Sequence, residues 1–151
     1  MFDAKRFLNM PFTAREDDVR VPDLRDFFPE GEEPVWRVRG LTGQELGVAI
    51  HAAERNKNAE AILDGIASSV SSRKADAIRK LLGERGDVTD DVARRLEMFV
   101  MGSVTPEADM QLAVKMCRVY PIEFLQITNA VNKLTGMGQV AKKKPPSSGT
   151  T

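Results

Sequence analysis

Apolar side chains recur at helical spacing between residues 105 and 136, on both sides of a single proline. Thr105 suits an N-cap and Pro106 suits the first position of a helix, so we predict that the first of two helices begins there. Pro121 lacks the N–H that a continuing helix needs, and Gly136 suits the left-handed residue that commonly ends a helix. The segment is therefore expected to form a helical hairpin. Its two apolar stripes comprise Leu112, Ala113, Met116, Cys117 and Tyr120, followed by Phe124, Ile127, Val131 and Leu134.

Further segments between residues 41 and 102 have the same spacing. Thr42 and Glu45 are placed as a capping box, Ser72 can cap a short helix, and Thr89 can open a helix that Gly102 ends. With the hairpin, these segments predict a compact bundle of about six helices. No repeat of fixed period is present, which argues against a solenoid. The predicted inward residues are Leu46, Ala49, Ile50 and Ala53; Ala59, Ile62, Leu63, Ile66 and Val70; Ile78, Leu81 and Leu82; and Val92, Leu96, Phe99 and Val100.

Residues 1–40 follow a different pattern, because several prolines prevent a long helix there. Val19 and Val21 alternate with polar neighbours, as do Trp36 and Val38, which predicts two short strands that pair as a hairpin. An isolated hairpin is marginal in water, so Trp36 is expected to pack on the helices. We interpret the apolar side chains of the intervening loop as core rather than as a ligand site. These side chains are Leu24, Phe27 and Phe28.

The sequence therefore predicts a mainly α fold in three parts. Residues 1–40 form an irregular, β-containing segment that packs on a helical domain of residues 41–138. Residues 139–151 lack an apolar stripe and combine lysines with proline, serine and glycine, which is typical of a disordered tail. We interpret Lys142, Lys143 and Lys144 as solvated rather than as a nucleic-acid site, because three charges supply little affinity at physiological salt.

Composition narrows the class of protein. The chain has 151 residues, of which 42% are hydrophobic and 29% charged, as expected for one soluble globular domain. Its 22 basic and 22 acidic residues cancel, so no strongly basic field attracts DNA or an acidic membrane, and little charge repulsion opposes self-association. One cysteine fits a reducing compartment, and the first residues resemble neither a signal peptide nor a membrane span. A cytoplasmic protein is expected.

No catalytic, metal or cofactor site is evident in the sequence. His51 and Glu54 lie on one helix without further metal ligands nearby, so a surface contact is preferred over a catalytic pair. Cys117 lies on an apolar stripe, where burial makes a thiol hard to ionise. Three glycines lack the lysine and the serine or threonine of a phosphate loop, and we interpret them as turn and packing positions: Gly40, Gly43 and Gly47. The sequence thus predicts a protein without enzymatic activity.

Four segments resemble one known family. They are VPDL at residues 21–24, WRVRGLTGQEL at 36–46, MFVMGSVTPEAD at 98–109 and YPIEFLQITNAVNKLTGMG at 120–138, followed by the basic tail. In combination and order they are similar to the tail assembly chaperones of long-tailed bacteriophages or prophages. The resemblance implies a chaperone that binds and solubilises the tape-measure protein in the host bacterial cytoplasm, helps recruit tail-tube subunits, and leaves before the virion is mature. It also implies a longer form of the chain, made by ribosomal frameshifting near the lysine run.

Flexible methionines and aliphatic side chains are well suited to bind many segments of one long helical client. On that basis we place the partner groove near the last two predicted helices, with Met110, Phe124, Ile127 and Val131 as its candidate residues and core packing as the alternative role of each. Without the resemblance, adaptor, oligomeric scaffold and chaperone all remain open. A DNA-binding regulator and an enzyme of unrecognised type are weaker alternatives. The predicted second helix offers few base-reading side chains, namely Gln126, Asn129, Asn132 and Lys133, with Glu123 opposing them.

Overall fold

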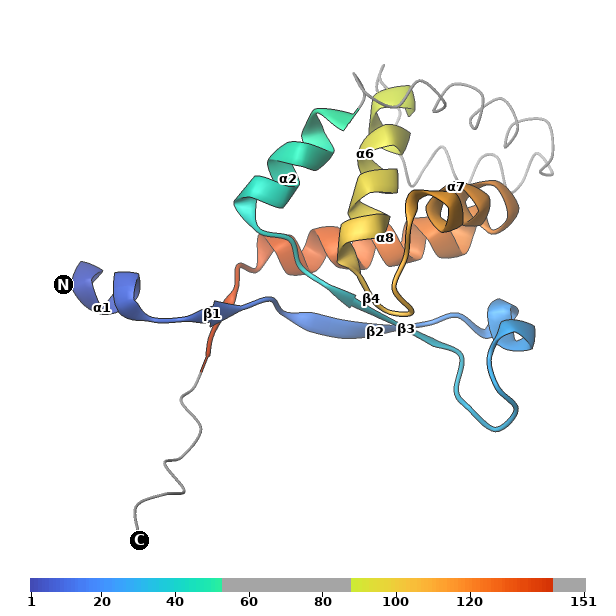
Figure 1. Ribbon diagram of the computed structural model, residues 1–151, viewed down its shortest axis with the longest axis horizontal. Helices are drawn as coiled ribbons and strands as arrows, with labels where there is room; N and C mark the ends of the chain where they lie inside the picture. The colour runs from blue at the N-terminus through green and yellow to red at the C-terminus, as the bar shows by residue number, and fades with distance from the viewer. Residues whose placement is uncertain (53–87, 143–151) are drawn as a thin grey trace, which may run out of the picture.

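The computed structural model describes residues 1–52 and 88–142, which form a mixed α/β fold. Helices lie over one face of a small antiparallel sheet (Figure 1). The predicted mainly α class is confirmed in part, because helices dominate the described residues but more strands are present than one hairpin supplies. The elements are α1 (Ala4–Asn9), β1 (Phe12–Thr13), β2 (Glu16–Arg20), the 3-10 helix η1 (Pro22–Phe27), β3 (Val35–Arg39), α2 (Gly43–Ile50), α6 (Val88–Gly102), β4 (Ser103–Thr105), α7 (Met110–Val119), α8 (Pro121–Gly136) and β5 (Val140–Ala141).

The main sheet has the strand order β2-β3-β4 and is antiparallel throughout. The hairpin predicted from the alternating pattern is confirmed, with Val19 opposite Trp36. The sequence did not indicate β4, which comes directly after α6 and places Thr105 opposite Arg37. The central strand β3 thus carries Trp36 into the middle of the molecule.

The first helix of the predicted hairpin begins at Met110, so the predicted start at Thr105 and Pro106 is wrong. Thr105 is the last residue of β4, where its backbone pairs with β3 and cannot cap a helix. Asp109 takes that role, and its carboxylate accepts a hydrogen bond of 2.8 Å from the Leu112 N–H.

The core lies between the sheet and helices α6 and α8. The rings of Trp36 and Phe99 have centroids 5.3 Å apart, and those of Phe99 and Phe124 have centroids 5.5 Å apart. Trp36 donates its indole N–H to the hydroxyl oxygen of Ser103 at 3.0 Å, so the polar atom of this buried ring is satisfied. The prediction that Trp36 packs on the helices is therefore confirmed.

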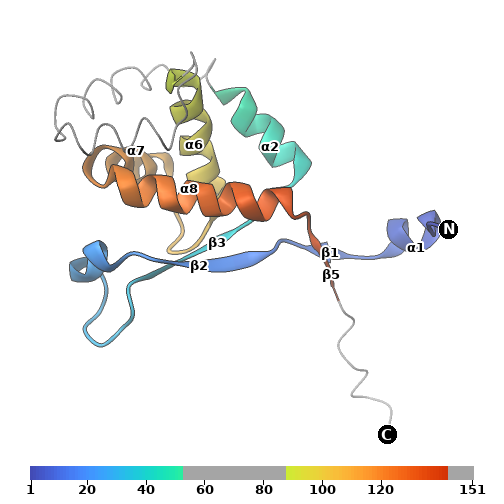
Figure 2. The ribbon, with the colours of Figure 1, turned by 180° about the vertical axis from the view of Figure 1, so that it is seen from behind.

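Helix α8 runs from Pro121 to Gly136 and lies above the main sheet in the view of Figure 2. Its predicted apolar stripe is buried. A Cβ atom at Gly102 would lie 2.5 Å from a methyl group of Val131, so the end of α6 packs against α8 with no room for a side chain. Gly136 is the last helical residue, but the positive φ of 75° belongs to Gly138. The left-handed turn therefore comes two residues after the position predicted for it.

Helix α2 begins with the capping box that the sequence predicted. Thr42 accepts a hydrogen bond from the Glu45 N–H at 3.1 Å, and the Glu45 carboxylate accepts one from the Thr42 N–H at 3.0 Å. Ala49 is buried as expected, but Ile50 is exposed, so the prediction that it faces inward is wrong. Among the described residues, this helix buries mainly small side chains.

Helix α6 spans Val88–Gly102, so it begins just before the Thr89 that was expected to open it. Of its predicted inward residues, Val92, Leu96 and Phe99 are buried, and Val100 is partly buried against the core. The helices predicted near residues 59–70 and 72–82 lie outside the described residues.

The chain after α8 turns back and forms β5, which pairs with β1. Lys142 donates its backbone N–H to the Pro11 carbonyl oxygen at 2.8 Å and extends this contact. The start of the expected tail, residues 139–142, is therefore held by strand pairing. The remainder, residues 143–151, lies outside the described residues.

Candidate functional site

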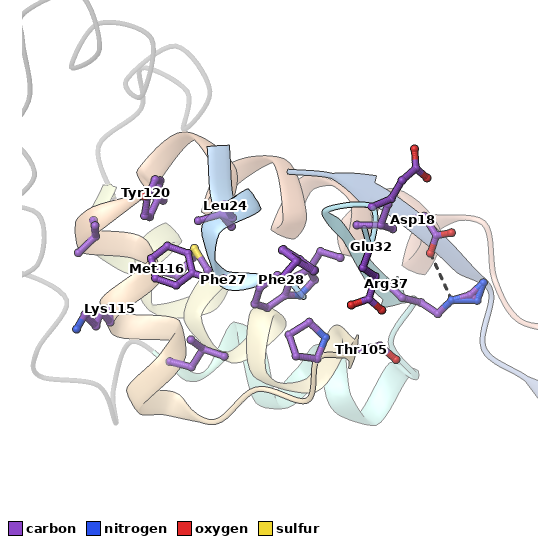
Figure 3. Close-up of a pocket in the computed structure, with 16 residues that line it drawn as sticks. Asp18, Leu24, Phe27, Phe28, Glu32, Arg37, Thr105, Lys115, Met116 and Tyr120 are labelled. Carbon is purple, nitrogen blue, oxygen red and sulfur yellow. Dashed lines mark ion pairs between the residues drawn. The ribbon is translucent and has the colours of Figure 1, made fainter. Parts of the chain in front are cut away.

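An apolar groove with a volume of about 730 Å³ lies between η1 and α7. We call it the η1–α7 groove. Side chains from η1 and the loop that follows it form one wall, and side chains from α7 form the other (Figure 3). Its lining comprises Asp18, Leu24, Phe27, Phe28, Glu32, Glu33, Val35, Trp36, Arg37, Thr105, Pro106, Leu112, Lys115, Met116, Val119 and Tyr120.

The first wall follows from the sequence around Pro22. Proline at the first position favours the helical turn of η1, and the Val21 N–H donates to the Pro34 carbonyl oxygen at 2.9 Å, which closes the loop onto β3. Leu24 is buried and anchors the turn in the core, whereas Phe27 remains 75% exposed at the groove. The prediction of a core role is thus confirmed for Leu24 and wrong for Phe27, while Phe28 packs partly buried against the core.

Helix α7 supplies the opposite wall. Met116 is buried beside the core, while Val119, the last residue of the helix, is 57% exposed. Side chains of this helix therefore reach both the core and the groove. An apolar surface that is open to solvent and bordered by polar residues is typical of an interaction site.

Charged side chains border the groove. Asp18 pairs with Arg37 at 3.3 Å, and both are about half exposed. Glu32 and Lys115 have no ion pair within the residues that the structure describes. The groove thus presents one acidic and one basic side chain that a bound partner can contact.

The residues predicted to bind the partner do not form this groove. Phe124, Ile127 and Val131 are in the core, with at most 1% of each side chain exposed. The prediction that they line a surface groove is wrong, because the sheet, α6 and α7 cover the face of α8 that carries them. Met110 packs partly buried against the same core and does not line the groove.

A polar network missed by the sequence analysis joins α6 to α8. Arg95 is largely buried, and its guanidinium donates to the Thr128 hydroxyl oxygen and the Asn129 amide oxygen, each at 2.7 Å. The same guanidinium pairs with Asp91 at 2.8 Å. Asn129 is thereby engaged inside the protein, which removes one of the few side chains of α8 that could read a base.

The candidate catalytic residues are not brought together. Cys117 is buried, and burial raises the pKa of its thiol to about 12, so it is not a thiolate nucleophile at neutral pH. His51 is exposed at the end of α2, and Glu54 lies outside the described residues. Within residues 1–52 and 88–142, no three metal-ligating side chains are grouped as a metal site would require.

A partly buried ion pair fixes the start of α2 on β3. The Arg39 guanidinium donates to both carboxylate oxygens of Glu45, at 2.9 and 2.6 Å. The hydrogen bonds from Arg39 are the main cause that lowers the pKa of Glu45 to about 2. This pair lies outside the groove lining.

The chain was compared with known proteins, and no family model, curated protein or solved structure matches it. In the segments that the structure describes, no helix is both long enough and apolar enough to cross a membrane. The function must therefore be inferred from the groove and from the sequence.

Proposed function

We propose that this chain is a tail assembly chaperone of a long-tailed bacteriophage or prophage, and that it binds apolar helical segments of the tape-measure protein in the η1–α7 groove. It acts in the host bacterial cytoplasm, helps recruit tail-tube subunits, and leaves before the virion is complete. Two arguments support this proposal: the resemblance carried by the four sequence segments, and the presence of an open apolar groove.

The observation that carries the proposal is the exposure of apolar side chains on both walls of the groove. An amphipathic helix placed there can bury its stripe against Phe27 and Val119, with Trp36 beneath. Met116 adds a flexible thioether that adapts to different side chains, which suits a client whose sequence changes along its length. Each contact is weak, but many copies bound along one client raise one another's effective concentration.

The structure offers a matched pair of variants for the test. Val119 and Ile50 are the last residues of α7 and α2, and they are 57% and 56% exposed, but only Val119 lines the groove. A lysine suits the C-terminal end of either helix, because its positive charge interacts favourably with the negative end of the helix dipole. Val119→Lys therefore places a charge in the groove, while Ile50→Lys makes the same change outside it.

The experiment expresses the tape-measure protein of the same phage or prophage in three ways: with the wild-type chain, with each variant, and alone. We expect the wild-type chain and Ile50→Lys to keep the client soluble and to copurify with it, and Val119→Lys to lose both effects. A client that is equally soluble without the chain, and that forms no complex with it, would refute the chaperone function. A complex that Val119→Lys leaves intact would refute the placement in this groove.

A further inference from the structure

The N-terminal arm, residues 1–13, carries apolar side chains that the rest of the described chain does not cover. No residue of α1 is buried, and the exposed fractions of Phe2 and Leu8 are 72% and 80%. The ring of Phe7 contacts those of Phe2 and Phe12, with centroids 5.5 and 5.1 Å apart. These rings form an aromatic cluster of their own, and such an exposed cluster is typical of a binding surface.

The arm and the η1–α7 groove lie at opposite ends of the molecule, as Figures 1 and 2 both show. The base of the arm is fixed, because β1 pairs with β5 through Phe12 and Ala141. Residues 14–18 then run in largely extended conformation toward the groove border at Asp18, which separates the end of the arm from that border by about 16 Å at roughly 3.3 Å per residue. In this conformation the arm points away from the groove of its own chain.

We propose that the arm of one copy binds in the η1–α7 groove of a second copy. The apolar side chains of Phe2, Phe7 and Leu8 match the apolar walls of the groove. The arm carries Lys5 and Arg6 with one acidic residue, Asp3, whereas the groove lining has three acidic and two basic side chains, so the net charges are opposite. Of the acidic side chains, Glu32 has no ion pair among the described residues. Apolar burial and charge complementarity therefore favour the same contact.

The contact is head-to-tail, because each copy uses its arm on one neighbour and its groove on the other. Such contacts are heterologous and produce open chains or closed rings rather than a simple two-fold dimer. The inference goes beyond the proposed function, since the association needs no tape-measure protein. Under the proposed function, the client would compete with the arm for the groove.

Two variants, called the disabled variants below, test the arm and the groove separately. Phe2→Asp/Leu8→Asp changes the arm alone, and Val119→Lys changes the groove alone; both leave the core untouched. Light scattering coupled to size-exclusion chromatography gives the mass of each purified full-length chain across a concentration series. Circular dichroism confirms that each variant is folded.

We expect the mass of the wild-type chain and of Ile50→Lys to rise with concentration, while each disabled variant stays monomeric. An equal mixture of the two disabled variants should form a dimer and nothing larger, because only one intact arm and one intact groove meet. A wild-type chain that is monomeric throughout, or an arm variant that still associates, would overturn the inference. A mixture that stays monomeric would also overturn it.

A charge exchange tests the orientation. Lys5→Glu should weaken association about threefold, the size expected for one exposed ion pair, and adding Glu32→Lys should restore it. No restoration would contradict the assigned orientation. The alternative partner for a basic, apolar arm is an anionic membrane. The proposal would be overturned if the wild-type chain stays monomeric and binds phosphatidylglycerol vesicles, while the arm variant does not bind them.

Discussion

Helix α8 and the 3-10 helix η1 both present large apolar side chains, but they use them in opposite ways. Phe124 of α8 is 1% exposed, whereas Phe27 of η1 is 75% exposed. The stripe of α8 repeats over sixteen residues and is covered by the sheet and two helices, while η1 is a six-residue turn at one end of the sheet. In these two elements, the long regular stripe of α8 forms core, whereas the short turn of η1 carries exposed apolar surface.

The largest effect on stability is expected in α8. Ile127→Ala should lower the free energy of unfolding by about 3 kcal/mol, because it removes buried methyl groups and leaves a cavity. Phe27→Ala removes a larger side chain from the groove and should change stability by about 0.5 kcal/mol or less. Urea denaturation followed by circular dichroism measures both. Comparable losses in the two variants would remove the distinction between the regions.

The second-largest loss of stability is expected when the polar network around Arg95 is broken. Arg95→Met should destabilise the protein by about 2 kcal/mol, because it leaves Asp91, Thr128 and Asn129 with unsatisfied polar atoms. Asp91 keeps its pair with Arg94, which limits the loss. The more exposed Arg94 is the control, and Arg94→Met should have less than half of that effect in the same denaturation assay. Equal effects would show that burial of Arg95 contributes little.

A smaller, pH-dependent effect is expected where α2 meets β3. The pKa of Glu45 is about 2 in the folded protein and near 4.5 in the unfolded chain, so the unfolded state binds protons more readily. The stabilisation is complete above about pH 4.5 and is lost as the pH falls toward about 2. Because Glu45 is partly exposed, we expect it to contribute about 1 kcal/mol at neutral pH.

Denaturation of the wild-type chain and of Glu45→Gln at several pH values tests this expectation. Their difference in stability should be largest at neutral pH and should shrink through the acid range. Glu33→Gln is the control, since its ion pair with Arg20 is exposed and should have little influence. A difference that is independent of pH would contradict the assignment.

The smallest effects on stability are expected at the groove itself. Val119→Lys and Ile50→Lys should each change the free energy of unfolding by about 0.5 kcal/mol or less, because both side chains are more than half exposed. A loss of client binding in Val119→Lys would then reflect the groove surface rather than unfolding. A substantial destabilisation of Val119→Lys alone would show that this residue belongs to the core.

The sequence predicted those elements whose signal is a short local pattern of residues. The alternation around Val19 and Trp36 gave the hairpin, and the spacing of Thr42 and Glu45 gave the capping box. Strand β4 was not predictable in the same way, because three residues carry no periodic signal and their pairing with β3 is long-range. Thr105 and Pro106 satisfy the local rules for a helix start, but strand pairing decides the outcome at this position.

The candidate site was not predictable for a related reason. Periodicity shows that Ile127 and Val131 share one face of a helix, but not whether another element covers that face. Phe27 belongs to no periodic pattern, so its exposure depends on where η1 leaves the sheet. Arg95 is a further example, since its partners Thr128 and Asn129 lie on another helix and come together with it only in the fold.

Photocrosslinking tests the central claim most directly, namely that the exposed η1–α7 groove binds the client. A photoreactive benzoylphenylalanine placed at position 27 or 119 should crosslink to a tape-measure protein that is co-expressed with the chain. The same group at position 50, which lies on another helix and is as exposed as position 119, should not crosslink. Crosslinks from position 50 alone, or none from positions 27 and 119 in a complex that still copurifies, would contradict the account.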